Sequence, residues 1–180
     1  MNRAQLEHVI RAAATIAEDQ EIIVIGSQAI LGRYPDAPDE LCVSADVDLY
    51  PRNHPDRADL IDGSIGELSP FHDTYGYYAQ GVGPQTAVLP SGWEERLVPV
   101  RTEAGTGFCL EPHDLVISKY AAAREKDREY VIAAQRHGLV SEETLLERLD
   151  QTTLDVEQRQ RLRARIQADA RGEPPRERAP

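Results

Sequence analysis

Long hydrophobic runs, cysteines and lysines are all scarce in this sequence. No apolar stretch approaches the roughly 18 residues of a membrane-spanning helix, and the polar, amphipathic beginning is unlike a signal peptide. Neither the two cysteines, Cys42 and Cys109, nor the five histidines show the spacing of a zinc site. A chain of 180 residues buries enough surface to fold without a disulfide or a metal. We therefore expect a cytoplasmic protein that does not bind membranes.

Charge is unevenly distributed along the chain. The 20 basic and 31 acidic residues give a net charge of −11, yet residues 151–180 carry 7 basic and only 5 acidic residues, so the acidity belongs to residues 1–150. Such a body excludes broad non-specific DNA binding, whose affinity comes from cations that neutralise phosphates. Only two cations are lysines, Lys119 and Lys126, and they lie in one segment. A nucleic acid partner would need a local patch, for which the candidates are Arg96, Arg101, Arg124 and Arg128.

The first half of the chain alternates between helical and strand patterns. Apolar residues at helical spacing, after a capping box formed by Asn2 and Gln5, predict a helix over 2–19. The apolar run at 21–25 predicts a buried strand. We further expect a short helix over 28–34, an alternating strand over 40–50, a short helix over 56–68 and a long loop over 69–86. The tyrosines of this loop would either stack a base or ribose or anchor the loop against the core: Tyr75, Tyr77 and Tyr78.

The second half predicts the end of the sheet and then helices. Three short strands, 86–89, 95–101 and 107–110, suggest an antiparallel ending. Helices are predicted from Pro112 to Arg124, onward to His137 before Gly138, and again from Ser141 and from Asp155. This order predicts an α/β (α+β) fold, with a mixed sheet flanked by helices and further C-terminal helices. We expect a first domain over 1–137, a helical extension over 138–170 and a disordered tail over 171–180.

The sharpest chemical feature is the pair Asp46 and Asp48 in the alternating strand. Because side chains of a strand repeat with period two, Ser44, Asp46 and Asp48 project from one face, with the two aspartates about 7 Å apart. Mg²⁺ suits such a pair, since it takes one or two carboxylates and completes its coordination with water and phosphate oxygens. The Ser44 hydroxyl is a further candidate phosphate contact. The alternative is two solvated carboxylates opposite an apolar face made of Leu41, Val43, Ala45, Val47 and Leu49.

A turn at Gly26 and Ser27 ends the first buried strand. Such a turn either presents backbone N–H groups and a hydroxyl to a phosphate or is a simple connection. The order of strand, Gly-Ser, short helix and Asp-x-Asp strand resembles the nucleotidyltransferase superfamily, which has the fold of DNA polymerase β. The resemblance implies a minimal nucleotidyltransferase fold in which Gly26 and Ser27 bind nucleotide phosphates while Asp46 and Asp48 hold Mg²⁺.

A second resemblance lies in the stretch LEPHDLVISKYAAAREKD. It is similar to the third motif of the AbiEii/MenT-type nucleotidyltransferases, which are toxins of toxin–antitoxin pairs. The resemblance implies a catalytic lysine at Lys119 that contacts the triphosphate, phosphate-binding cations at Arg124 and Lys126, and a further catalytic carboxylate at Asp127, with Glu111 as the alternative. If the helix breaks near Arg124, Asp127 becomes an N-cap and turns toward the strand aspartates. The other interpretation is an exposed, salt-bridged helix face.

Together these motifs predict a Mg²⁺-dependent enzyme that transfers NMP from an NTP to an acceptor, with pyrophosphate leaving. The resemblance implies that the acceptor is a tRNA end or a protein hydroxyl, and that a toxin role would bring an antitoxin as partner. Two alternatives stay open. One is a non-catalytic domain of the same fold that binds a nucleotide or a protein, and the other is an enzyme that modifies a small, cationic, antibiotic-like molecule.

Overall fold

A five-stranded mixed sheet organises the chain up to about residue 110. The computed structural model describes residues 1–172, apart from the side chains of Glu125 and Lys126. The strands are β1 (Glu21–Val24), β2 (Asp46–Pro51), β3 (Tyr78–Gly81), β4 (Val98–Arg101) and β5 (Thr106–Cys109), in the order β3-β2-β1-β5-β4. β1 pairs antiparallel with β2 and parallel with β5, β2 pairs parallel with β3, and β4 pairs antiparallel with β5. The predicted fold class and the antiparallel ending are confirmed.

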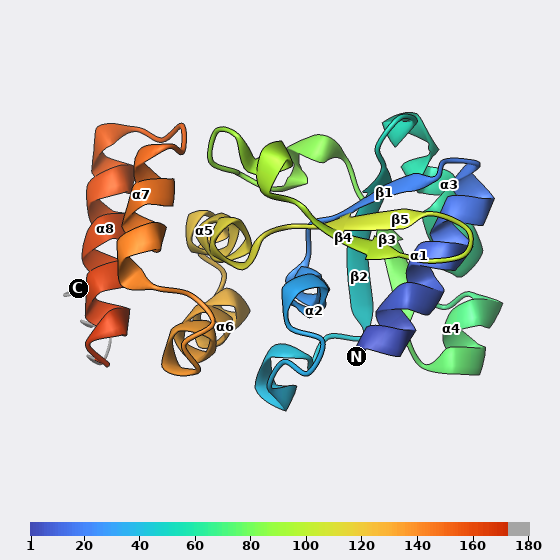
Figure 1. Cartoon of the computed structure of the whole chain (residues 1–180), viewed down its shortest axis with the longest axis horizontal. Coiled ribbons are helices and arrows are strands. Elements are labelled where there is room, and N and C mark those ends of the chain that lie inside the picture. Colours follow the sequence, from blue (N-terminus) through green and yellow to red (C-terminus); the bar gives the residue numbers. More distant parts are fainter. Residues whose placement is uncertain (173–180) are drawn as a thin grey trace.

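Helices flank the sheet and continue beyond it. They are α1 (Arg3–Ala17), α2 (Ile30–Arg33), α3 (Ala58–Ile65), α4 (Pro70–Tyr75), α5 (Pro112–Ala122), α6 (Glu125–Arg136), α7 (Glu142–Asp150) and α8 (Val156–Ala170). Figure 1 shows α1, α3 and α4 beside the sheet, α5 and α6 in the middle, and α7 with α8 at the end farthest from the sheet. In the described part of the chain, no helix is long and apolar enough to cross a membrane.

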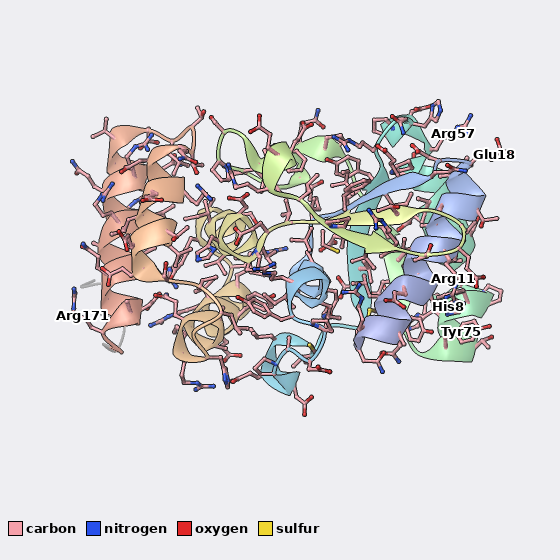
Figure 2. All side chains as sticks on the ribbon, viewed as in Figure 1. His8, Arg11, Glu18, Arg57, Tyr75 and Arg171 are labelled. Carbon is pink, nitrogen blue, oxygen red and sulfur yellow. The ribbon has the colours of Figure 1, made fainter. Side chains whose placement is uncertain are left out.

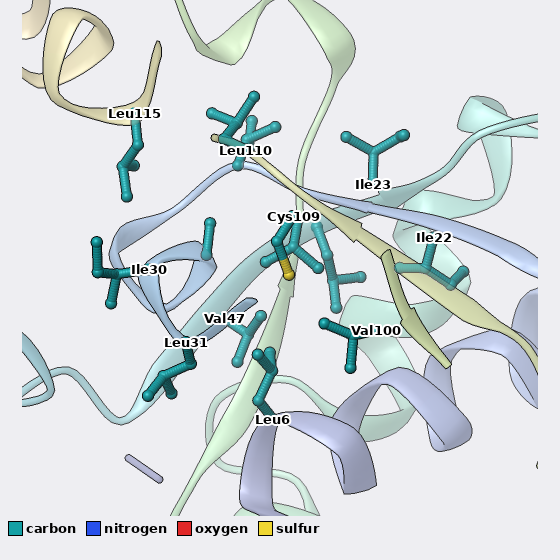
Figure 3. Packing of buried hydrophobic residues seen from close by; sticks show 14 of the residues in the cluster. Leu6, Ile22, Ile23, Ile30, Leu31, Val47, Val100, Cys109, Leu110 and Leu115 are labelled. Carbon is teal, nitrogen blue, oxygen red and sulfur yellow. The ribbon is translucent and has the colours of Figure 1, made fainter. Parts of the chain in front are cut away.

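The two faces of the sheet differ in chemistry. One face meets α1 and is apolar, and its fully buried side chains include Ile22, Val24, Val47, Leu49 and Cys109. Figure 3 shows Leu6 of α1 next to Val47 in this core. Since Asp46 and Asp48 alternate with these apolar residues along β2, they lie on the opposite face. The alternation predicted from the sequence is therefore present from Asp46 to Leu49.

The strand that carries the aspartates begins later than predicted. Residues 39–41 form a 3-10 turn after Pro38, and β2 starts only at Asp46. β1 ends at Val24, which pairs with Leu49, and the pairing with β3 begins at Asp46 and Tyr78, so the residues before Asp46 extend past both neighbouring strands. Val43 is accordingly 81% exposed. The apolar face predicted over 40–50 is wrong at its start.

Three further expectations are corrected by the structure. The predicted loop at 69–86 contains α4 and β3, because Ser69 caps the helix and β3 finds β2 as a parallel partner. The predicted strand at 86–89 is absent: residues 84–86 form a 3-10 turn, and the only bridge near it joins Pro90 to Thr152 within the described residues. Likewise, residues 93–96 form a 3-10 turn, so only 98–101 of the strand predicted at 95–101 exists.

The helical region after Pro112 breaks where the sequence allows it. α5 ends at Ala122, Ala123 adopts a left-handed conformation with φ of 53°, and Arg124 is the N-cap of α6. The break near Arg124 is confirmed. The N-cap role for Asp127 is wrong, since Asp127 is the third residue of α6. Gly138, with φ of 67°, follows the end of α6 as predicted.

A buried ion cluster joins α7 to α5. Asp114 is fully buried and accepts hydrogen bonds from Arg96 Nε at 2.8 Å and Nη2 at 3.1 Å, while Arg148 Nε lies 3.2 Å from its Oδ1. The C-terminal helices are therefore fastened to the helix that follows the sheet. The domain boundaries named above stay predictions, and the tail expected over 171–180 lies outside the described residues from position 173 onward.

Candidate active site

A cavity of about 340 Å³ lies where the polar face of the sheet meets α5 and α6. Segments far apart in the sequence line it: the turn after β1, the loop into β2, β2 itself, and both helices. The structure brings eight of the predicted site residues to this cavity, namely Gly26, Ser27, Ser44, Asp46, Asp48, Lys119, Arg124 and Asp127. The side chain of Lys126 lies outside the described residues, so its predicted role stays a prediction.

The carboxylates of β2 are held in a defined setting. Ser44 Oγ donates a hydrogen bond to Asp46 Oδ1, and the backbone carbonyl of Asp48 accepts from Ile25 N at 3.0 Å. Gly26 lies so close to Asp48 that a Cβ at position 26 would be 2.2 Å from Asp48 Oδ2. Glycine is therefore required sterically at position 26, although its backbone conformation is open to any residue. The turn and the Asp-x-Asp strand are packed as one unit.

Lys119 links the turn to the helices. Its Nζ donates to Ser27 Oγ at 2.8 Å and to Asp127 Oδ1 at 3.0 Å, and only 7% of its side chain is exposed. Burial lowers the pKa of Lys119, and the hydrogen bond to Asp127 acts in the opposite direction. The sequence places these residues on opposite sides of the α5–α6 break, and the break allows the carboxylate to reach back to the lysine.

Asp127 holds both cations of the cavity. Arg124 Nε donates to Asp127 Oδ2 at 2.7 Å, while the other carboxylate oxygen receives Lys119. Burial opposes ionisation of Asp127, but the hydrogen bonds from Arg124 and Lys119 outweigh it and lower the pKa of this carboxyl. The Arg124 side chain is 59% exposed, so the guanidinium can reach a ligand while it stays tethered.

The two candidates for a third carboxylate separate clearly. Glu111 is the N-cap of α5: it accepts from His113 N at 2.9 Å and Asp114 N at 3.3 Å, and it is absent from the residues that line the cavity. Asp127 lines the cavity but is engaged by two cations. Among the side chains that the structure describes, no group of three or more from His, Cys, Asp or Glu is placed to hold a metal ion.

A comparison with protein-family models identifies the relationship of this chain. Residues 4–169 match the family described as "Nucleotidyltransferase of unknown function (DUF6036)". The chain belongs to this family. The match confirms the resemblance to nucleotidyltransferases in general. It does not confirm the narrower resemblance to the AbiEii/MenT-type toxins. Neither a curated protein nor a solved structure matches the chain.

The predicted basic patch is not assembled at the cavity. Among its four arginines, only Arg124 lines the cavity. Arg96 is held by the buried Asp114, where it serves the packing of α5. Arg101 is on β4, at the edge of the sheet opposite β3. A nucleic acid partner would therefore meet few of the expected cations at the cavity.

The three tyrosines predicted to lie in a loop point to two different places. Tyr77 is buried, its hydroxyl lies 2.8 Å from His8 Nδ1, and its ring contacts those of Phe71 and Tyr75. Figure 2 shows His8 and Tyr75 together near α1 and α4, away from the cavity. Tyr78 lies instead on the aspartate face and stacks against His72 with ring centroids 4.6 Å apart. Tyr77 therefore anchors its segment against the core, and it is not placed to stack on a base.

Three residues of the site were missed from the sequence. Gln80 lines the cavity because the β2–β3 register places it opposite Asp48 on the same face. Tyr130 of α6 lines it as well and contacts both the turn and Lys119. Gln28 is fully buried behind the turn and donates to the Ser44 carbonyl at 3.3 Å. These contacts arise from strand pairing and helix docking between distant segments. No local sequence motif therefore predicts them.

Proposed function

We propose that this protein transfers a nucleoside monophosphate from an NTP to an acceptor in a Mg²⁺-dependent reaction. One observation carries the proposal: Asp46 and Asp48 share a single cavity with Ser27, Lys119 and Arg124. Paired carboxylates next to a lysine, an arginine and a hydroxyl are the groups that a metal-bound triphosphate requires. The membership of the chain in a nucleotidyltransferase family supports the same reaction.

The residues present fit a magnesium ion. Asp46 and Asp48 supply two hard oxygen donors from one face of β2, and the lack of a side chain at Gly26 lets the Asp48 carboxylate lie directly against the turn. A divalent ion in such sites neutralises charge on the phosphates and stabilises the attacking and leaving oxygens. With only two carboxylates in the set, the substrate phosphates would complete the coordination.

The chain itself supplies the remaining steps. Lys119 and Arg124 bind the phosphates and offset the charge that grows on the departing pyrophosphate, while Asp127 keeps both cations at the cavity. The acceptor oxygen forms a bond to the α-phosphorus as the bond to pyrophosphate breaks, and the acceptor proton passes to water. A volume of about 340 Å³ is at the small end of ligand sites, so the acceptor enters with its reactive end alone.

The charge of the cavity bears on the acceptor. Among the described residues, its lining contains five acidic side chains, Glu40, Asp46, Asp48, Asp127 and Glu129, and two basic ones, Lys119 and Arg124. This excess favours a small cationic acceptor as a second candidate beside the tRNA end or protein hydroxyl that the family resemblance implies. If the acceptor is a tRNA end, the proposal includes an antitoxin as a protein partner.

The test is metal-dependent transfer from labelled NTPs. The full chain is incubated with each of the four α-labelled NTPs and Mg²⁺, together with tRNA, a protein mixture or a panel of cationic small molecules. We expect transfer that EDTA abolishes and Mg²⁺ restores. Asp46→Asn and Asp48→Asn should each lower the rate by at least about a hundredfold, whereas Asp59→Asn, an exposed aspartate of α3, should leave it unchanged.

Two results would contradict this function. The first is the absence of transfer with all four NTPs and every acceptor. The second is unchanged transfer by both β2 variants, because the carboxylates would then have no part in the reaction. Binding of an NTP without transfer would support the non-catalytic alternative.

A further inference from the structure

Tyr130 completes a closed set of contacts among three residues that line the cavity. Its hydroxyl donates to the Ser27 carbonyl at 2.8 Å, and its ring centroid lies 4.3 Å from Lys119 Nζ. The same Nζ donates to Ser27 Oγ at 2.8 Å. Three segments, the turn after β1, α5 and α6, therefore meet through three side chains.

The ring of Tyr130 faces a cation that is shielded from water. Tyr130 is 7% exposed and Lys119 6%. An ammonium over an aromatic face is attracted by the ring quadrupole, and the attraction is larger where water is excluded. Burial raises the pKa of Tyr130, so the phenol stays neutral and remains a donor to the Ser27 carbonyl.

We propose that Tyr130 is a positioning residue that fixes Lys119 and the Ser27 turn relative to each other for triphosphate binding. The inference rests on the proposed function, since it takes this cavity as the triphosphate site. Lys119 is held by a hydroxyl, a carboxylate and a ring, and each restricts its long and otherwise flexible side chain. Tyr130 also holds the backbone of the turn, so both groups that would contact the phosphates share one support.

Two substitutions separate the ring from the hydroxyl. Tyr130→Phe keeps the aromatic face below Lys119 and removes the hydrogen bond to Ser27. Tyr130→Leu removes both and keeps an apolar side chain. Tyr120→Phe is the matched control, because Tyr120 is also a buried tyrosine with a bonded hydroxyl, to Asp169, but it does not line the cavity.

The probe is inorganic tripolyphosphate with Mg²⁺, and its binding to the full chain is measured by calorimetry. We expect Tyr130→Leu to weaken binding about tenfold and Tyr130→Phe about threefold, while Tyr120→Phe lowers only the melting temperature. In a Lys119→Ala background both Tyr130 substitutions should lose most of their effect, because Tyr130 then has no lysine against which to place the Ser27 turn. A purely structural role would weaken binding equally in either background.

Several outcomes would overturn the proposal. One is that Tyr130→Leu binds tripolyphosphate as tightly as the wild type does. Another is that the Tyr130 substitutions weaken binding by the same factor in the Lys119→Ala background. The third is that the wild type does not bind tripolyphosphate. If Tyr130→Leu does not fold, the nearly isosteric Tyr130→Phe and its cycle with Lys119→Ala decide the question. Nucleotide transfer is assayed on the same proteins. If the effects of the Tyr130 and Lys119 substitutions on binding are coupled but no transfer occurs, the transferase function is overturned and the role of Tyr130 is supported. If transfer occurs but the effects are additive, the transferase function is supported and the role of Tyr130 is overturned.

Discussion

Substituting Gly26 by alanine perturbs the contact between the turn and β2 by a single methyl group. The new Cβ would lie 2.2 Å from Asp48 Oδ2 and 2.8 Å from Asp48 Cβ. Neither partner is free to move away, because Ile25 N donates to the Asp48 carbonyl at 3.0 Å and Ala29 N donates to the Gly26 carbonyl at 3.0 Å. Rotation of the Asp48 side chain can relieve the contact with Oδ2 but not the one with Cβ, so the backbone of one of the two segments must shift as well, despite these hydrogen bonds.

The size of the displacement follows from the contact distance. Ordinary contact of a Cβ begins near 3.4 Å, so the Asp48 carboxylate has to shift by about 1 Å, and misplacement of that size at a reacting centre costs about a hundredfold in rate. The extra atom also strains the packing, at about 1 to 3 kcal/mol of unfolding free energy. A hundredfold loss of rate is about 2.7 kcal/mol, as large as the loss of stability, so the variant should stay folded and yet be nearly inactive.

The assay compares kcat for NTP-dependent transfer with thermal unfolding of the same protein. Gly63→Ala is the matched control, because an added Cβ there meets nothing within 4 Å and the site lies in α3, where alanine is preferred to glycine by about 0.5 to 1 kcal/mol. Gly63→Ala should melt about 1 to 4 °C higher with unchanged kcat. A folded Gly26→Ala protein with kcat within threefold of the wild type would show that the placement of Asp48 does not matter.

Three other predictions concern stability and metal use. Asp114→Ala leaves Arg96 without its fully buried acceptor and Arg148 without its ion-pair partner, and should lower the free energy of unfolding, measured with urea, by about 3 kcal/mol; a loss below about 1 kcal/mol would contradict the buried cluster. Burial opposes ionisation of Asp19, but its hydrogen bonds outweigh this and lower its pKa, so its stabilisation is full at neutral pH and is lost as the pH falls through the folded pKa, below 3.8. Asp19→Asn should therefore destabilise more at about pH 6 than at about pH 3, and equal losses would refute this assignment. Gln80→Asp adds a carboxylate opposite Asp48 and should lower the Mg²⁺ concentration that half-saturates transfer. An unchanged concentration would show that the ion binds elsewhere.

The parts of the site that follow from local geometry could be predicted from the sequence. Period-two alternation in β2 puts Asp46 and Asp48 on one face in any sheet that buries Val47 and Leu49. The Gly26 turn follows a short apolar run that can only be a buried strand or a helix segment, and the run is too short for a helix. In these cases neighbouring residues carry the information.

The remaining parts depend on pairing between distant segments. β3 has four residues, and its neighbouring tyrosines and glycines are typical of a loop; the strand exists because its backbone pairs with β2. The same pairing brings Gln80 to Asp48. The late start of β2 has the same cause, since the pairing with β3 begins only at Asp46 and the pairing with β1 only at Leu49. The strand propensity of single residues predicts neither the presence of β3 nor the starting residue of β2.

The distribution of charge implies an order of binding. The described side chains that line the cavity have a formal charge of −3, and Asp127 already neutralises part of the two cations that would receive phosphates. A free triphosphate would be repelled by Asp46 and Asp48, whereas a divalent ion between them and the phosphates turns that repulsion into attraction. Tripolyphosphate should therefore bind weakly or not at all in EDTA, and should bind when Mg²⁺ is added. Asp46→Asn combined with Asp48→Asn should remove this dependence, because the repulsion and the metal donors disappear together. Equal Mg²⁺ dependence of that double variant and the wild type would refute the assignment of these carboxylates.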